Sequence, residues 1–204
     1  MSKIIAFSGG CCSGKTTTLQ ALAKELEAHG RKVVILHENI RVFIDALGLK
    51  SIDEARENPE TYLRIQNKAI HEKIYKAEVA LKDKSDTIYL EDRFLSDSLF
   101  YLKNYVDKTK LSGRLLRSFK NLQHDVIVKL YNFSTNYYMI LDFYPLKTDE
   151  LSKYRPINLH ETKYVEYEGI RGINSRFIPY YKLTSIDLNE TSIENVINDI
   201  MLLL

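Results

Sequence analysis

The stretch GGCCSGKT, residues 9–16, decides the fold, and it follows a short apolar run at residues 4–7. It matches the pattern G-x-x-x-x-G-K-[S/T] at every fixed position. Its members, with the threonine that follows, are Gly9, Gly10, Cys11, Cys12, Ser13, Gly14, Lys15, Thr16 and Thr17. After them, apolar residues recur at helical spacing, at Leu19, Leu22, Ala23 and Leu26. The motif therefore lies between a predicted strand and a predicted amphipathic helix, which is the context that it requires.

A loop of this sequence is expected to bind phosphate. Its glycines let successive backbone N–H groups face inward, and these dipoles act with the N-terminus of the next helix on phosphate oxygens. We expect Lys15 on the outer phosphates of ATP and the Thr16 hydroxyl on Mg²⁺. All residues from 9 to 17 are candidates for nucleotide binding. The alternative, a glycine-rich turn with a chance lysine, does not explain the flanking strand and helix.

Apolar runs alternate with helical patterns along the rest of the chain. The further predicted strands are residues 33–36, 87–90, 138–143 and 183–188, and the predicted helices are 42–47, 52–55, 59–84, 96–105, 111–130 and 193–203. This order predicts an α/β protein in which helices cover both faces of a parallel five-stranded sheet. Together with the motif at residues 9–16, it indicates a three-layer P-loop NTPase fold. We expect a single domain over residues 1–204, because this length suits one buried core.

The composition is that of an ordinary globular protein. Hydrophobic residues make up 45% and charged residues 27%, and the net charge of +2 argues against a chain that is basic throughout. Cys11 and Cys12 are the two cysteines, and they provide neither a disulfide framework nor a zinc site. We expect a soluble, cytoplasmic protein, because no stretch has the apolar length of a signal peptide or a membrane span.

Polar residues follow the second predicted strand in the order His37-Glu38-Asn39-Ile40-Arg41. Ligands of open parallel sheets bind outside the carboxyl ends of the strands, so Glu38 is expected to face the phosphate-binding loop. A carboxylate there could take the proton from an attacking hydroxyl, and Arg41 could contact the substrate. The alternative is a carboxylate that stabilises the dipole of the next helix.

Glu91, Asp92 and Arg93 follow the third predicted strand. An acidic residue at this point holds Mg²⁺ in many phosphoryl-transfer enzymes, and Asp92 is the candidate. Arg93 could reach a phosphate or a substrate oxygen. A surface ion pair is the alternative. Between Glu38 and Asp92, the sequence leaves the general base open.

Residues 145–176 are polar, charged and only weakly periodic, which favours a lid over the active site. An arginine that a closing lid brings in could stabilise the transferring phosphoryl group. The basic residues of this stretch are Lys147, Lys153, Arg155, Lys163, Arg171 and Arg176. The alternative is a solvated loop.

The predicted helix at 111–130 and the residues before it are rich in positive charge. Between Lys103 and Lys129, seven basic residues stand against two acids. Arg114 and Arg117 lie three residues apart and share a helix face, which a phosphorylated substrate or a nucleic acid could use. A plain solvated helix face explains the same pattern.

With these residues together, the chain resembles P-loop kinases of the nucleoside and nucleotide kinase group. It is most similar to the subfamily that includes the NadR-type ribosylnicotinamide kinase domain and related phage and bacterial AAA-like ATPase/kinase domains. The similarity is carried by residues 9–17, by Glu38 and Arg41 at an E-x-x-R pattern, by Asp92, Arg93, Asp97 and Tyr101 at D-R-x-x-x-D-x-x-x-Y, and by residues 168–171 at a D-G-x-R lid segment. Glu168 departs from the aspartate of that last pattern.

The resemblance implies an ATP- and Mg²⁺-dependent phosphotransferase. It implies catalytic roles for Lys15 and the lid residue Arg171, and acceptor binding by Arg93 and Asp97. Residues 103–136 match nothing in the group, and we expect them to form a helical insertion that selects the substrate.

The acceptor that these patterns favour is a small nucleoside or nucleotide. One alternative is a kinase that acts on a hydroxymethylated base in DNA, as related phage enzymes do. Another is an NTP-dependent regulatory module without an acceptor. The sequence indicates nothing about oligomeric state.

Overall fold

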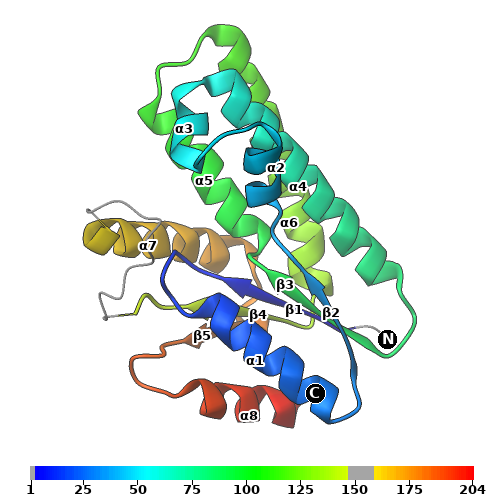
Figure 1. The fold of residues 1–204 in the computed structure, drawn as a ribbon. Helices are drawn as coiled ribbons and strands as arrows, with labels where there is room; N and C mark the ends of the chain where they lie inside the picture. Colours follow the sequence, from blue (N-terminus) through cyan, green and yellow to red (C-terminus); the bar gives the residue numbers. More distant parts are fainter. Residues whose placement is uncertain (1–2, 147–158) are drawn as a thin grey trace.

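Five parallel strands form the centre of the protein (Figure 1). The computed structural model describes residues 3–146 and 159–204. The strands are β1 (Lys3–Ser8), β2 (Lys32–Leu36), β3 (Thr87–Asp92), β4 (Met139–Phe143) and β5 (Leu183–Ile186), in the spatial order β2-β3-β1-β4-β5. The α/β fold with a parallel five-stranded sheet is confirmed. In this order, β1 lies at the centre of the sheet, so the loop after it opens between the neighbouring strands β3 and β4.

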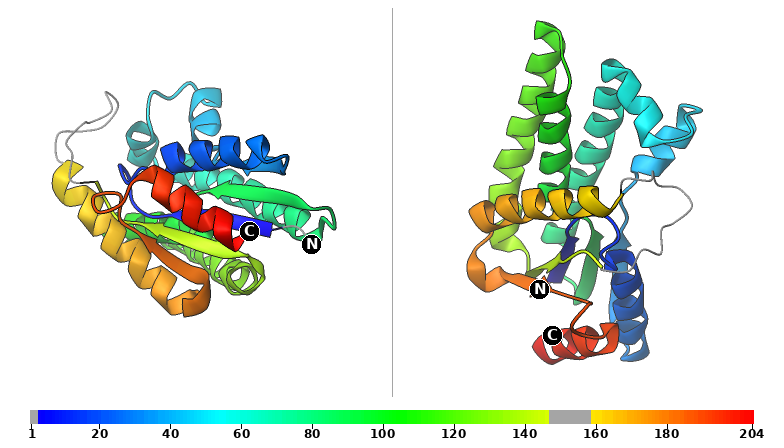
Figure 2. Two further views of the ribbon diagram at one scale, coloured as in Figure 1. Left: turned by 90° about the horizontal axis from the view of Figure 1, so that it is seen from below. Right: turned by 90° about the vertical axis from the view of Figure 1, so that its left-hand side faces the viewer.

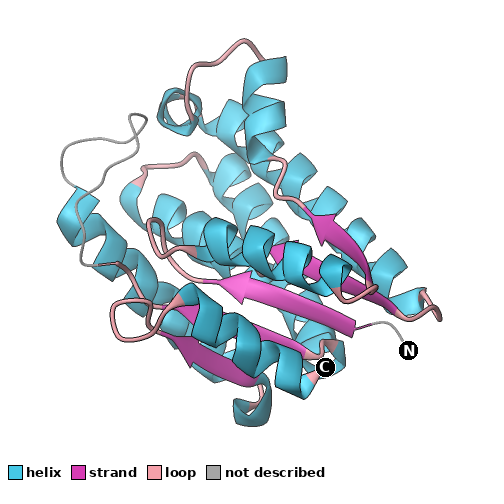
Figure 3. Cartoon of the chain, turned by 60° about the horizontal axis from the view of Figure 1, so that its bottom comes forward, coloured by secondary structure: helices cyan, strands magenta, loops and turns pink. Residues whose placement is uncertain are grey.

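Helices cover both faces of the sheet, as predicted (Figures 1 and 3). The N-terminal and C-terminal helices, α1 (Lys15–Ala28) and α8 (Ile193–Leu203), contact each other on one face. The other helices are α2 (Ile40–Ala46), α3 (Ile52–Glu57), α4 (Pro59–Lys82), α5 (Leu95–Lys108), α6 (Gly113–Asn136) and α7 (Leu159–Phe177), and a short 3₁₀ helix covers Tyr180–Lys182. The helices α4 to α7 pack on the opposite face or on one another.

Side chains of β1 alternate between the two hydrophobic cores. Ile4 and Ala6 belong to the core beneath α4, α5 and α6, whereas Ile5 and Phe7 belong to the core beneath α1 and α8. All four are at most 1% exposed. A strand buried on both faces reads as a continuous apolar run, which explains why residues 4–7 show no polar alternation.

Local signals in the sequence set the starts of the long helices. Asn58 caps α4 by accepting hydrogen bonds from the N–H groups of Glu60 and Thr61, and Pro59 occupies the first turn. Ser112 caps α6 in the same way by accepting from Leu115. The pair α5–α6 extends away from the sheet together with α4 (Figure 2, right). This helical extension includes most of residues 103–136.

The sequence predicts no helix within residues 145–176, and here the structure differs. Residues 159–177 form the helix α7, although their sequence is weakly periodic. Tertiary packing explains the helix, because Tyr167, Ile170 and Asn174 are buried against the rest of the protein. Residues 147–158, with Lys147, Lys153 and Arg155 of the predicted lid, lie outside the described residues. Lys163, Arg171 and Arg176 lie on α7.

Within the described ranges, no helix combines the length and the apolar character that crossing a membrane would require.

Candidate functional site

The loop between β1 and α1 has the positive-φ backbone that its glycines permit. Gly9 has φ = 130° and Gly14 has φ = 80°, and Cys12 adopts a left-handed conformation with φ = 52°. A Cβ atom on Gly9 would lie 2.6 Å from the carbonyl oxygen of Phe143 in β4. The first glycine of the motif is thus required both for its conformation and for its close approach to the next strand.

Lys15 occupies the first turn of α1, and its side chain folds back into the loop. Its Nζ donates to the carbonyl oxygen of Gly10 and to Ser13 Oγ, the latter at 2.9 Å. Burial is the main cause that lowers the pKa of Lys15 to about 8; the neighbouring cation of Arg93 contributes to this shift, and Asp97 and Asp92 oppose it. A phosphate bound here would place a negative charge beside the buried ammonium group and stabilise its charged form.

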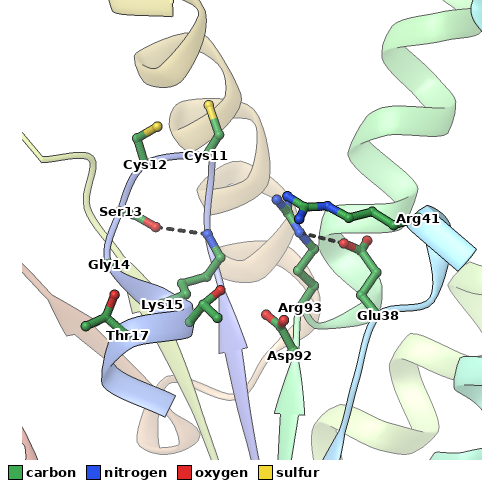
Figure 4. Close-up of a pocket in the computed structure, with 11 residues that line it drawn as sticks. Cys11, Cys12, Ser13, Gly14, Lys15, Thr17, Glu38, Arg41, Asp92 and Arg93 are labelled. Atoms are coloured by element: carbon green, nitrogen blue, oxygen red, sulfur yellow. Dashed lines mark hydrogen bonds and ion pairs between the residues drawn. The ribbon is translucent and has the colours of Figure 1, made fainter. Parts of the chain in front are cut away.

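A pocket of about 380 Å³ opens in front of this loop (Figure 4). Three segments contribute to its wall, namely the loop with the start of α1, the residues after β2, and the end of β3. The lining residues are Cys11, Cys12, Ser13, Gly14, Lys15, Thr16, Thr17, Glu38, Arg41, Asp92 and Arg93. The structure therefore brings together the predicted phosphate-binding loop and the predicted polar residues at two strand ends.

Arg93 links the two strand ends. Its Nε lies 2.9 Å from Glu38 Oε2, and its Nη1 lies 3.7 Å from Asp97 Oδ2. Burial lowers the pKa of Arg93, but Tyr101, Glu38 and the nearby aspartates raise it above its usual value, so the guanidinium stays charged. Arg93 also has φ = 66°, which is a left-handed backbone conformation. This conformation is costly for a residue with a side chain, and residues that adopt it cluster at functional sites.

Glu91 and Asp92 point to opposite faces of β3. Asp92 lines the pocket, whereas Glu91 is 1% exposed and lies 3.6 Å from Lys73 Nζ of α4. Burial raises the pKa of Glu91, and Lys73 opposes this shift. The strand alternation thus selects Asp92 as the acid of the pocket.

Thr16 and Asp92 fit a magnesium ion. Both line the same pocket, and both offer the hard oxygen ligands that Mg²⁺ prefers. Mg²⁺ commonly keeps several water ligands and takes few from the protein, so two such residues beside a phosphate site suit it. No cluster of three His, Cys, Asp or Glu side chains suited to a metal occurs among residues 3–146 and 159–204.

Asp97 lies beneath the loop and does not line the pocket. It is 1% exposed, accepts a 2.6 Å hydrogen bond from Ser8 Oγ, and accepts a longer one from the N–H of Gly9. Burial raises the pKa of Asp97, and Arg93 and Lys15 oppose this shift. These contacts anchor the start of the loop and Arg93, so Asp97 acts on the pocket through other residues.

Two further polar residues extend this buried network, and sequence reasoning missed both. Asn174 of α7 donates to Ser8 Oγ at 2.9 Å and to Asp142 Oδ1 of β4 at 3.1 Å. Burial raises the pKa of Asp142 to about 6, with a further contribution from the charge of Asp97. Asp142 could have been noticed as a polar residue near the end of the apolar stretch that forms β4, whereas nothing in the sequence marked Asn174.

Arg41 and Arg171 lie in different surroundings. Arg41 lines the pocket, and its side chain extends toward the guanidinium of Arg93 (Figure 4). Arg171 is exposed on α7 and lies over the ring of Tyr167, 5.7 Å from its centre. It does not line the pocket in this structure.

The sheet order, the loop conformation and the pocket together define a P-loop nucleotide-binding protein of the α/β class. A family described as an AAA domain matches residues 4–137, which is more than half of the chain, and the protein belongs to this family. No curated protein matches the sequence.

Solved structures with the same fold include two of NadR. One is a crystal structure of NadR in complex with NR, with a TM-score of 0.66 and 17% identity. The other is of NadR in complex with NAD and AMP-PNP, with a TM-score of 0.59 and 16% identity. Each match covers 98% of this chain but only 50% and 48% of the NadR chains, so the protein corresponds to about half of their length. At this identity the likeness establishes the fold.

Proposed function

We propose that the protein is an ATP- and Mg²⁺-dependent kinase that transfers the γ-phosphoryl group to a nucleoside or nucleotide. The observation that carries this proposal is the composition of one pocket. Its phosphate-binding loop lies opposite a second set of charged residues, Glu38, Arg41, Asp92 and Arg93. Phosphate binding alone would also suit an ATPase or a switch, whereas carboxylates and arginines across the pocket also suit an acceptor.

The nucleotide side of the site comprises residues 9–17. In this proposal the loop N–H groups bind the phosphates and Lys15 neutralises charge on the outer ones. Thr16 and Asp92 would hold Mg²⁺, which when bound offsets the negative charge that develops during transfer. The fit of the two oxygen ligands and the lysine at the start of α1 supports this assignment.

The acceptor side comprises the residues at the ends of β2 and β3. Glu38 or Asp92 would orient the acceptor hydroxyl and take its proton, and Arg41 and Arg93 would hold acceptor or phosphate oxygens. Asp97 would contribute by holding Arg93 and the start of the loop. Arg171 stays a candidate for a lid arginine on the family resemblance, although it is exposed on α7.

The neighbours in fold support the class of substrate. NadR has been crystallised with NR, and with NAD and AMP-PNP. These ligands are small nucleosides and nucleotides, and we extend that class to this protein as part of the proposal.

The direct test is transfer of labelled phosphate from ATP to a panel of acceptors. The panel holds nucleosides, nucleoside monophosphates, nicotinamide riboside and DNA that contains a hydroxymethylated base. We expect ATP consumption to depend on one small acceptor and to be lost in the Lys15→Ala variant. Circular dichroism checks that this variant keeps its fold. Full activity of that variant would refute the phosphate-binding assignment, and consumption that needs no acceptor would favour a regulatory module.

A second candidate acceptor, a modified base within DNA, is favoured by one observation. Six basic side chains are exposed at and beside the far end of the α5–α6 pair, and none of them forms an ion pair with another residue of the described chain. They are Lys103, Lys108, Lys110, Arg114, Arg117 and Lys120. If this surface follows a DNA backbone, binding should weaken steeply as salt is added. Absence of salt-sensitive DNA binding would leave the small acceptor as the proposal.

A further inference from the structure

Helix α7 contacts the phosphate-binding loop directly at Gly10 and Cys11. A Cβ atom on Gly10 would lie 3.2 Å from Glu166 Cβ and 3.3 Å from the backbone nitrogen of Tyr167. The Glu166 carboxylate accepts a hydrogen bond of 3.0 Å from the N–H of Cys11 through Oε2. Glu166 is therefore a residue of α7 that binds the backbone of the loop, and it lies outside the residues that line the pocket.

The N–H that Glu166 binds belongs to the same peptide group as the carbonyl that Lys15 binds. Lys15 Nζ donates to the carbonyl oxygen of Gly10, and the carbonyl carbon of Gly10 is bonded to the nitrogen of Cys11. In a trans peptide the C=O and N–H point in opposite directions. Glu166 on the α7 side and Lys15 on the pocket side thus hold the two ends of one rigid unit.

The Glu166 carboxylate is itself held in place from the acceptor side. Tyr101 of α5 donates to the same Oε2 at 3.2 Å, and Arg93 Nη1 donates to the Tyr101 hydroxyl at 3.2 Å. Arg93 in turn pairs with Glu38. A continuous chain of hydrogen bonds therefore runs from Arg93, a predicted acceptor residue, through Tyr101 and Glu166. It ends at the peptide group whose carbonyl binds Lys15.

We propose that Glu166 is a positioning residue for Lys15, acting through the peptide group between Gly10 and Cys11. By accepting from the N–H of Cys11, it keeps the carbonyl of Gly10 turned toward the pocket. That carbonyl holds the ammonium group where the outer phosphates bind. The inference rests on the proposed function, because it assigns Lys15 to the phosphates of ATP.

Two variants of similar size separate a hydrogen-bond acceptor from mere packing. Glu166→Gln keeps an oxygen that can accept from Cys11, whereas Glu166→Met keeps the stem against Gly10 and loses the acceptor. Glu190→Gln, at an exposed position in the turn before α8, controls for the loss of one charge. Thermal melting of each variant checks that the protein stays folded.

The measurement is the dissociation constant for MgATP without an acceptor, obtained by competition with a fluorescent nucleotide. We expect binding about tenfold weaker in Glu166→Met, which is about 1.4 kcal/mol, and within about twofold of wild type in Glu166→Gln and Glu190→Gln. Unchanged or tighter binding in Glu166→Met, or equal losses in the Met and Gln variants, would overturn the proposal.

Combining each change with Lys15→Ala separates this proposal from the one on which it rests. If Glu166 acts through Lys15, Glu166→Met should weaken binding by less than about twofold in the Lys15→Ala protein. Fully additive losses would overturn the positioning role while leaving the phosphate site intact. If Lys15→Ala itself leaves MgATP binding unchanged, the proposed function fails instead.

Discussion

Arg93 Nε lies 2.9 Å from Glu38 Oε2, and this ion pair joins the ends of two neighbouring strands. Glu38 follows β2 and Arg93 follows β3, and both side chains are mostly buried at the pocket, with 24% and 15% exposed. A carboxylate has two oxygens, so Oε1 can still accept a proton while Oε2 stays paired. The pair thus orients Glu38 without removing its capacity to act as a base.

The two candidate bases can be separated by their dependence on Mg²⁺. We expect Glu38→Gln to lower the rate of phosphoryl transfer by about 10² to 10⁴-fold, the range for loss of a general base, with the Mg²⁺ requirement unchanged. Asp92→Asn should instead raise the Mg²⁺ concentration needed for half-maximal rate, because it removes the proposed metal ligand. Rates measured over a Mg²⁺ titration distinguish them. A reversed pattern would assign the base to Asp92.

MgATP affinity should fall as the pH rises from 7 to 9. The pKa of Lys15 is lowered to about 8, so the free protein loses this positive charge above pH 8, whereas bound phosphate favours the protonated form. One proton linked to binding predicts about tenfold weaker binding at pH 9 than at pH 7. Titration calorimetry in buffers of different ionisation enthalpy should detect uptake of about half a proton at pH 8.

Lys15→Arg is the control for this pH dependence. A guanidinium stays protonated over the whole range, so the affinity of this variant should not change between pH 7 and 9. The same slope in wild type and Lys15→Arg would show that another group titrates.

Gly9→Ala should damage the protein far more than Gly30→Ala. Both glycines have positive φ, at 130° and 74°, but a Cβ on Gly9 would lie 2.6 Å from a backbone oxygen, whereas Gly30 faces open space. We expect Gly30→Ala to cost about 1 kcal/mol of the free energy of unfolding. Gly9→Ala should cost several times more or abolish MgATP binding, because the loop must shift away from β4. Urea denaturation and nucleotide binding of the two variants test this, and equal effects would contradict it.

Asp142→Asn should stabilise the protein at neutral pH. Burial and the charge of Asp97 raise the pKa of Asp142 from 3.8 to about 6 in the folded state. The folded state therefore holds more protons than the unfolded state between these values, and the free energy of unfolding falls as the pH rises through this window. Asparagine avoids the buried charge and keeps an oxygen for Asn174.

The expected gain is of order 2 kcal/mol above pH 7, and it should shrink toward pH 4. Urea denaturation at pH 4.5 and 7.5 measures this difference. A variant that is less stable than wild type by the same amount at both values would show that Asp142 is held ionised by its partners.

The family resemblance and the strand pattern predicted most of the architecture and much of the pocket. Residues 11–17, Glu38, Arg41, Asp92 and Arg93 line one pocket because the carboxyl ends of adjacent parallel strands meet at one edge of the sheet, whereas Gly9 and Gly10 of the predicted loop do not line it. The predicted helix start at residue 59 was also right, and Asn58 caps α4 there, whereas α6 begins at Gly113, two residues after its predicted start. These features are local, so the order of residues is enough to indicate them.

Tertiary structure decided what depends on contacts between distant segments. The sequence determined a phosphate-binding loop, a parallel sheet and polar residues at the strand ends. Asp92 was already the candidate from the sequence, but the physical reason that Asp92 rather than Glu91 faces the pocket is the side of β3 that α4 covers. The sequence could not place Glu166 on the N–H of Cys11, because the helix α7 owes its position to burial against the sheet and its neighbouring helices.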